Sequence, residues 1–192
     1  MAVSTTRIAE ALAANGVDVE VLAWSRRLPA GQMETTGRGE SRRPTVHRLG
    51  MFGSWDATLQ HTMIALEWLH GQDLFHAAWG HYLVPAGFAA VLFAESVGIP
   101  STVSARGNDV DRLAFPPGDF ARLQWTLQRA DVLTAVSRDL AKKVEVLLGE
   151  DNRTVHVLPN SVDGKIFAAD AAEGVGERLG VRPGELLSLI HI

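Results

Sequence analysis

A short polar run with residues suited to ligand binding directly follows an apolar segment of the chain. Ser-Thr-Val-Ser-Ala at 101–105 is followed by Arg-Gly-Asn-Asp at 106–109. The Arg106 guanidinium offers a fork of donors to phosphate or sugar oxygens, and the adjacent glycine lets backbone approach a ligand closely. Asp109 is suited to accept a hydrogen bond from a ligand hydroxyl or to orient Arg106. The open alternative is an ordinary loop in which Arg106 pairs with Asp109 or Asp111.

Two histidines occupy comparable positions earlier in the chain. His76 ends the short apolar segment at 73–77, and His81 opens the next helical region, so both are placed to line a binding pocket. For His76 the open alternative is a strand-end histidine with Trp79 packed over it. The two histidines are five residues apart with no carboxylate cluster near them. Because this spacing matches no common set of metal ligands, we expect no metal.

Three small polar residues, Ser137, Asn160 and Asp163, follow later apolar segments. Ser137 is most simply a helix cap, and from the end of a strand it can also contact a ligand. Asn160 and Asp163 are either turn formers or ligand contacts.

An alternation of strands and helices must position these residues. The predicted strands cover 17–24, 45–50, 73–77, 101–105, 131–137 and 154–159, and the predicted helices cover 4–16, 54–71, 83–97, 119–129 and 137–149. The predicted amino-terminal caps are Ser4, Ser54, Asp119 and Ser137, and the predicted helix ends are Gly16, Gly71 and Gly149. Residues 25–44 are predicted to form a long exposed loop, and 106–112 a polar loop.

This alternation predicts a doubly wound α/β fold, in which helices flank a mostly parallel sheet. Ligands of such sheets bind beyond the carboxyl ends of the strands. The predicted strand exits carry Trp24, Ser25, Gly50, His76, Trp79, His81, 106–109, Ser137 and 160–163. We therefore expect the binding site at that one edge of the sheet.

The composition excludes several classes of protein. The 192 residues carry a formal net charge of -4 and 18 Lys and Arg, without the clustered basic face that nucleic-acid binding requires. The absence of cysteine excludes disulfides and a cysteine nucleophile and suits a reducing compartment. The amino-terminal residues lack the apolar core of a signal peptide. The longest apolar run, 83–99, contains Pro85 and Glu95 and is too short to span a bilayer.

Three ordered motifs carry a family resemblance. They are GIPSTVSARGNDVDR, ADVLTAVSRDL and VHVLPNSVDGKIF. Over residues 4–180 the chain resembles the amino-terminal half of a family 4 glycosyltransferase of the GT-B fold. It departs from the family pattern at Arg106, where many members carry histidine, at Ala78 in the usual His-x-His, and at Ser161, where glycine is usual.

The resemblance implies a Rossmann-like acceptor domain at 1–168 and the start of a linker at 169–186. The final six residues at 187–192, LSLIHI, match the in-frame translation of a common sequencing-adapter end, so we expect them to be a non-native tail. It implies a nucleotide-sugar domain beyond the linker, where the main donor-site residues belong. The first strand and its glycine turn are expected ahead of residue 1, so that Met1 is not the natural start. The residues implied to line the acceptor cleft are His76, His81, Arg106, Gly107, Asn108, Asp109, Ser137, Asn160 and Asp163.

The implied activity is retaining transfer of a sugar from a nucleotide-sugar co-substrate to a saccharide, lipid-linked or small-molecule acceptor. No cofactor, metal or nucleic-acid partner is expected, and the isolated chain is expected to be inactive. An epimerase or phosphorylase of the same fold, or a non-catalytic ligand-binding domain, remains an open alternative. The implied location is the cytoplasm, with peripheral contact with the inner face of the membrane as a further alternative.

Overall fold

The computed structural model describes residues 3–113, 117–149, 151 and 153–160, together with the single positions 164, 178 and 180. The chain divides into one unit of residues 1–159 and a second unit of residues 160–192. The helices and strands given below all belong to the first unit. The predicted domain boundary at 168 and the tail at 187–192 lie outside the described residues and stay predictions.

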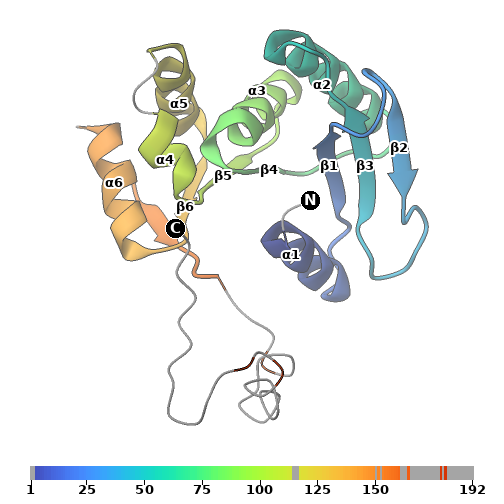
Figure 1. Ribbon diagram of the computed structural model, residues 1–192, viewed down its shortest axis with the longest axis horizontal. Coiled ribbons are helices and arrows are strands. Elements are labelled where there is room, and N and C mark those ends of the chain that lie inside the picture. The colour runs from blue at the N-terminus through green and yellow to red at the C-terminus, as the bar shows by residue number, and fades with distance from the viewer. Residues whose placement is uncertain are drawn as a thin grey trace. The chain divides into compact units, whose positions relative to one another are not determined.

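Two β-sheets form the centre of the first unit (Figure 1). The three-stranded sheet has the order β1-β3-β2, from β1 (Glu20–Ser25), β3 (Thr45–Gly50) and β2 (Met33–Thr36). The four-stranded sheet has the order β4-β5-β6-β7, from β4 (Ala78–His81), β5 (Ser101–Ala105), β6 (Val132–Ala135) and β7 (Val155–Val157). Every pair is parallel except β2 with β3. The predicted α/β fold with a mostly parallel sheet is therefore confirmed.

Helices connect and flank these strands. They are α1 (Val3–Ala14), α2 (Trp55–His70), the π-helical turn η1 (Leu83–Gly87), α3 (Phe88–Val97), α4 (Asn108–Leu113), α5 (Pro117–Arg129) and α6 (Arg138–Leu148). Ser54 and Ser137 cap α2 and α6 as predicted, by accepting from Ala57 N and Leu140 N. The caps predicted at Ser4 and Asp119 are wrong, because α1 and α5 already begin at Val3 and Pro117.

Three predicted segments differ from the structure. The expected loop at 25–44 contains β2. Because Thr35 and Thr36 are exposed, this strand lacks the alternation of apolar and polar residues by which a strand is predicted from sequence. The expected polar loop at 106–112 contains most of α4. The strand expected at 73–77 lies instead at 78–81 and includes Gly80. Glycine is required at this strand position because a side chain there would collide with the backbone of Gly87 in η1.

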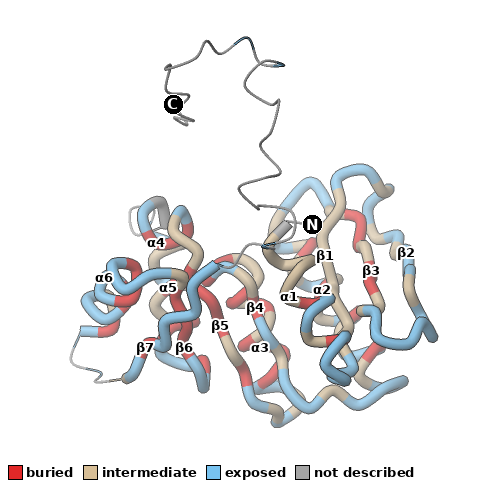
Figure 2. The backbone as a smooth tube through the Cα atoms, turned by 90° about the horizontal axis from the view of Figure 1, so that it is seen from below, coloured by how far each residue is buried: buried red, intermediate tan, exposed pale blue. Residues whose placement is uncertain are grey.

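The hydrophobic core lies between the four-stranded sheet and its helices. Val103 and Leu133 from β5 and β6 pack with Val91, Leu123 and Val144 from α3, α5 and α6, all nearly inaccessible to solvent. Figure 2 shows buried residues on β5, β6 and the helix sides that face them, and also on β3 of the three-stranded sheet. This core fixes the ends of four parallel strands in one place.

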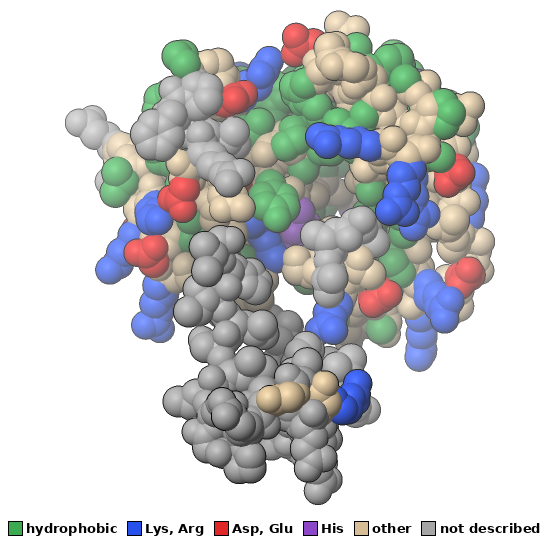
Figure 3. All heavy atoms as spheres, in the orientation of Figure 1, with side chains coloured by type: hydrophobic (Ala, Val, Ile, Leu, Met, Phe, Trp, Pro, Cys, Tyr) green, Lys and Arg blue, Asp and Glu red, His purple; other side chains and the backbone are tan. Residues whose placement is uncertain are grey.

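The surface mixes charges of both signs. On the face drawn in Figure 3, Lys and Arg side chains are interspersed with Asp and Glu side chains. Among the residues that the structure describes, no helix is long and apolar enough to cross a membrane.

Candidate functional site

The four parallel strands bring several of the predicted residues to one edge of the sheet. His81 ends β4, Arg106 and Gly107 follow β5, and Ser137 follows β6. Because all four strands run in the same direction, these positions share the edge at which the strands end. We call it the carboxyl edge.

The Asp109 carboxylate accepts hydrogen bonds from backbone N–H groups of this edge. Its side chain is buried, with a relative exposure of 4%. One carboxylate oxygen accepts from Arg106 N at 3.0 Å and Gly107 N at 2.8 Å, and the other accepts from Leu83 N at 2.8 Å. Leu83 follows β4 and Arg106 follows β5, so a single carboxylate joins the exits of two strands. The structure therefore gives Asp109 a positioning role, and it turns the carboxylate inward rather than toward an open cleft.

His81 is a neutral imidazole at neutral pH. Burial, followed by the positive charge of Arg106, lowers the pKa of His81 from 6.5 to about 4. The ring stacks on Trp79 with centroids 5.1 Å apart and an interplanar angle of 29°. Its Nδ1 is buried and has no hydrogen-bond partner among the described residues. Buried polar atoms are nearly always bonded, so an unbonded one at a strand exit marks a candidate ligand contact.

Hydrogen bonds across the strands hold the Trp79 ring on which His81 stacks. Trp79 Nε1 donates to Ser104 Oγ at 2.8 Å, and Ser104 Oγ bonds Thr134 Oγ1 at 2.7 Å. Ser104 and Thr134 are themselves buried, in β5 and β6. Trp79 and His81 thus lie in orientations that the sheet itself fixes.

Tyr82 is a residue of this edge that the sequence did not reveal. Its φ of 75° and ψ of 145° are rare for a residue with a side chain, and such a conformation costs about 1–3 kcal/mol. Its N–H donates to the Ser104 carbonyl at 3.1 Å, and its carbonyl accepts from Gly87 N at 2.8 Å. The phenol side chain remains 39% exposed. Strain that surrounding bonds maintain beside His81 is typical of a functional site, and the only sequence signal is the nearby Pro85.

The other predicted residues differ in their placement. His76 is exposed and precedes β4, so it lies at the amino end of that strand, and its predicted place at a strand exit is wrong. Ser137 is exposed and caps α6, and Asn108 is exposed at the start of α4. Asn160 is exposed. Asp163 lies outside the described residues.

The exits of the three-stranded sheet are occupied by the chain itself. Ser25 Oγ accepts from Arg27 N at 3.2 Å, and a side chain at Gly50 would collide with the carbonyl of Pro29. Trp24 Nε1 donates to Thr62 of α2 at 2.9 Å. Within the described parts of the chain, no group of three or more His, Asp or Glu side chains could hold a metal ion. The three residues predicted at the exits of this sheet therefore make their contacts within the chain.

Comparison with known proteins identifies relatives. A family model described as a glycosyl transferase 4-like domain matches residues 1–161. The N-acetyl-alpha-D-glucosaminyl L-malate synthase of Bacillus anthracis is 24% identical over 152 residues, which cover 77% of this chain and 39% of that protein. The putative teichuronic acid biosynthesis glycosyltransferase TuaC of Bacillus subtilis (strain 168) is 31% identical over 112 residues, which cover 57% of this chain and 27% of that protein. The matched part of the chain thus covers less than half the length of either relative.

Proposed function

Because the chain belongs to the glycosyl transferase 4-like domain family, we propose that the intact protein transfers a sugar from a nucleotide-sugar donor to an acceptor, with retention at the anomeric carbon. The match over residues 1–161 is the observation that carries this proposal. Both relatives support it, since one is named a glycosyltransferase and the other a glucosaminyl malate synthase. We assign the acceptor to the carboxyl edge, where polar groups of this chain meet.

The acceptor in this proposal carries an acidic group. Arg106 follows β5, and its positive charge acts on His81. A guanidinium binds a carboxylate through two parallel hydrogen bonds, which fixes both position and orientation. The names of the two relatives contain L-malate and teichuronic acid, which are both acids. In this proposal the Arg106 guanidinium binds the acceptor carboxylate through two parallel hydrogen bonds.

The transfer itself forms one bond and breaks another. The acceptor hydroxyl oxygen bonds to the anomeric carbon, the bond from that carbon to the nucleoside diphosphate breaks, and the hydroxyl proton is released. In this proposal neutral His81 makes a hydrogen bond to the acceptor and orients its hydroxyl. A base with a pKa of about 4 takes up little of the released proton near neutral pH, so positioning is the better assignment for His81 than proton abstraction.

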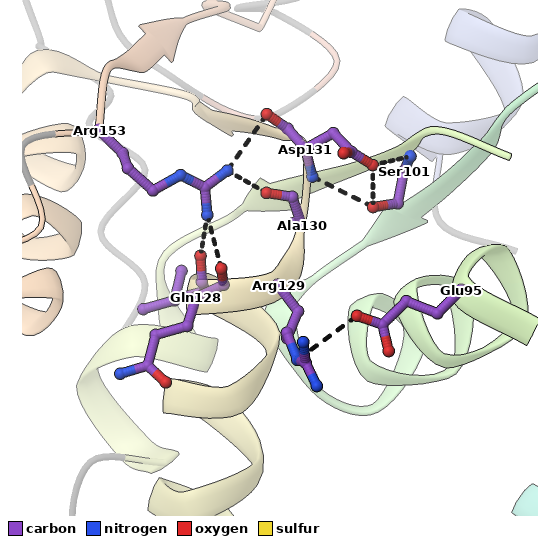
Figure 4. Close-up of polar contacts among 8 residues, drawn as sticks. Glu95, Ser101, Gln128, Arg129, Ala130, Asp131 and Arg153 are labelled. Atoms are coloured by element: carbon purple, nitrogen blue, oxygen red, sulfur yellow. Dashed lines mark hydrogen bonds and ion pairs between the residues drawn. The ribbon is translucent and has the colours of Figure 1, made fainter. Parts of the chain in front are cut away.

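Steady-state kinetics of the intact enzyme test this assignment. Arg106→Gln is expected to raise the KM for a carboxylated acceptor about tenfold or more, with little change in the KM for the donor, because it removes about 1.5–3 kcal/mol of charge-assisted hydrogen bonding. A neutral acceptor with the carboxylate replaced by an amide is expected to respond little to this substitution. Arg129→Gln is the matched control, because Arg129 pairs with Glu95 at the other end of the sheet (Figure 4).

Two results would contradict parts of the proposal. Equal losses by Arg106→Gln toward acidic and neutral acceptors would refute the acidic acceptor while leaving the transferase intact. Failure of the wild-type enzyme to consume any nucleotide sugar, in the presence of a panel of acidic and neutral acceptors, would refute the transferase itself.

A further inference from the structure

Three polar side chains of the three-stranded sheet form a continuous line of hydrogen bonds. Glu20 Oε2 lies 2.8 Å from His47 Nε2, and His47 Nδ1 lies 2.9 Å from Thr35 Oγ1. Glu20 belongs to β1, His47 to β3 and Thr35 to β2, so the line crosses the whole sheet. It lies apart from the carboxyl edge, which belongs to the four-stranded sheet. The proposed sugar transfer makes no use of these three groups.

The strand register explains why the three side chains meet. Thr35 is the direct partner of His47 in the antiparallel pair, and Leu22 is its partner in the parallel pair. Glu20 is two residues from Leu22, so its side chain emerges on the same face of the sheet. His47 is buried, with an exposed fraction of 2%, whereas Thr35 is exposed. A buried imidazole therefore lies directly behind an exposed hydroxyl.

The partners of His47 assign its hydrogens. A carboxylate has no hydrogen to donate, so Nε2 carries a hydrogen and donates to Glu20. In a neutral imidazole the other nitrogen is then an acceptor, and the Thr35 hydroxyl donates to Nδ1. Carboxylate, imidazole and hydroxyl in this order form the arrangement in which a base activates a hydroxyl nucleophile. Because Thr35 is the exposed member, its oxygen is the one that a reagent from solvent meets.

The backbone of Thr35 adds a donor beside its hydroxyl. Thr45 N donates to Val19 O, toward β1, and N–H directions alternate along a strand, so His47 N also points toward β1. His47 and Thr35 are therefore a pair that exchanges no backbone hydrogen bonds, and the Thr35 N–H points to the outer edge of β2. No strand of the described residues pairs with this edge (Figure 1). An outward N–H at the nucleophile itself can stabilise an oxyanion.

We propose that Thr35 is a nucleophile that accepts an acyl group from an activated ester, with His47 as its general base. The Thr35 oxygen bonds to the carbonyl carbon, and the bond from that carbon to the leaving oxygen breaks. The hydroxyl proton passes to His47 Nδ1 and then to the leaving oxygen, while Glu20 holds the imidazole in orientation. The Thr35 N–H donates to the carbonyl oxygen while that oxygen carries negative charge. The product is an ester of Thr35, and its formation is an activity separate from sugar transfer.

Acetylation of the intact protein by p-nitrophenyl acetate tests the proposal. Thr36 is the internal control, because it is an exposed threonine of the same strand whose hydroxyl accepts from Arg48 Nη1 at 3.2 Å and contacts no base. Trypsin cleaves after Arg27 and Arg38, so one peptide contains both threonines and fragmentation distinguishes them. Mass spectrometry is expected to find the acetyl group on Thr35 about ten times or more as often as on Thr36.

Variants separate the nucleophile from its base. Thr35→Val removes the hydroxyl and is expected to abolish this acetylation, whereas Thr35→Ser is expected to retain it. Glu20→Gln is expected to slow acetylation of Thr35 about tenfold or more, because an amide can bond either tautomer of the imidazole. Thermal unfolding followed by circular dichroism establishes that the Glu20 variant is folded. The comparison of Thr35 with Thr36 in the wild-type protein needs no variant.

Three results would overturn the proposal. The first is equal acetylation of Thr35 and Thr36 in the wild-type protein. The second is acetylation confined to lysine side chains, which react with this ester without any neighbouring base. The third is an unchanged rate of Thr35 acetylation in a folded Glu20→Gln variant, which would leave Glu20 and His47 as a structural pair.

Discussion

Replacing Asp109 with asparagine should weaken the carboxyl edge more than the loss of one charge suggests. The carboxylate accepts from Arg106 N, Gly107 N and Leu83 N, whereas an asparagine side chain keeps only one oxygen. If that oxygen stays with Arg106 and Gly107, the amide NH2 group faces the N–H of Leu83, which is 1% exposed and finds no solvent. The opposite orientation leaves two N–H groups unbonded.

The cheaper orientation sets the magnitude. One buried N–H without a partner costs about 1–3 kcal/mol, and the remaining bonds weaken because their acceptor is neutral. We therefore expect Asp109→Asn to lower the free energy of unfolding by about 2–3 kcal/mol. For a chain of this size each kcal/mol lowers Tm by about 2–4 °C, so the expected decrease is about 4–12 °C.

Thermal unfolding followed by circular dichroism, with hydrogen exchange of the three amides, measures this effect. Asp111→Asn is the matched control, because Asp111 is exposed and its 3.1 Å contact with Lys143 is a surface ion pair, which contributes little to stability. The reasoning fails if Asp109→Asn and Asp111→Asn unfold at the same temperature. It also fails if stability falls while the amides of Leu83, Arg106 and Gly107 keep their exchange rates.

Two further predictions concern stability. The pKa of His81 is about 4 in the folded chain and 6.5 in the unfolded chain, so the unfolded chain binds the proton first and stability falls as the pH decreases from 6.5 to 4. Measurements of Tm against pH should show that His81→Gln removes this decrease. His156→Gln, at an exposed position on β7, should retain it. Arg153→Met should cost about 2–3 kcal/mol in urea unfolding, because its guanidinium donates to four carbonyls at the end of α5 and between α5 and β6 (Figure 4). Arg129→Met should cost less than about 1 kcal/mol, because it removes an exposed ion pair with Glu95 and an exposed contact with the Trp125 ring. Equal costs of the two substitutions would refute the assignment.

The order of strands and helices could be predicted because apolar pattern and caps agree locally. The strands at 45–50 and 101–105 have the predicted bounds, and Gly16 and Gly149 end helices with φ of 86° and 67° as expected of glycine. Such signals are local, so they can be read without knowing the tertiary structure.

The remainder depended on contacts between distant segments. The short apolar segment at 73–77 was predicted as a strand, whereas β4 lies at 78–81, where Gly80 packs against the backbone of Gly87. That contact forms only in the fold, and His76 was therefore placed at the wrong end of the strand. The positive φ of Tyr82 leaves no trace in composition. Asp109 was predicted as a site residue, but the three N–H groups that turn its carboxylate inward come together only in the fold.

The two ends of the four-stranded sheet are built on different principles. At the amino end, Asp131 accepts from the N–H and hydroxyl of Ser101 at 2.7 Å and 3.0 Å, bonds that lower the pKa of Asp131, and Arg153 satisfies the carbonyls beside it. At the carboxyl end, Tyr82 is strained and His81 Nδ1 is buried without a partner among the described residues. Strain of about 1–3 kcal/mol persists only where other interactions offset it. The bonds of Asp131 and Arg153 at the amino end and of Asp109 at the carboxyl end are interactions of that kind, so the strained backbone of Tyr82 and the unbonded Nδ1 of His81 are tolerated between them.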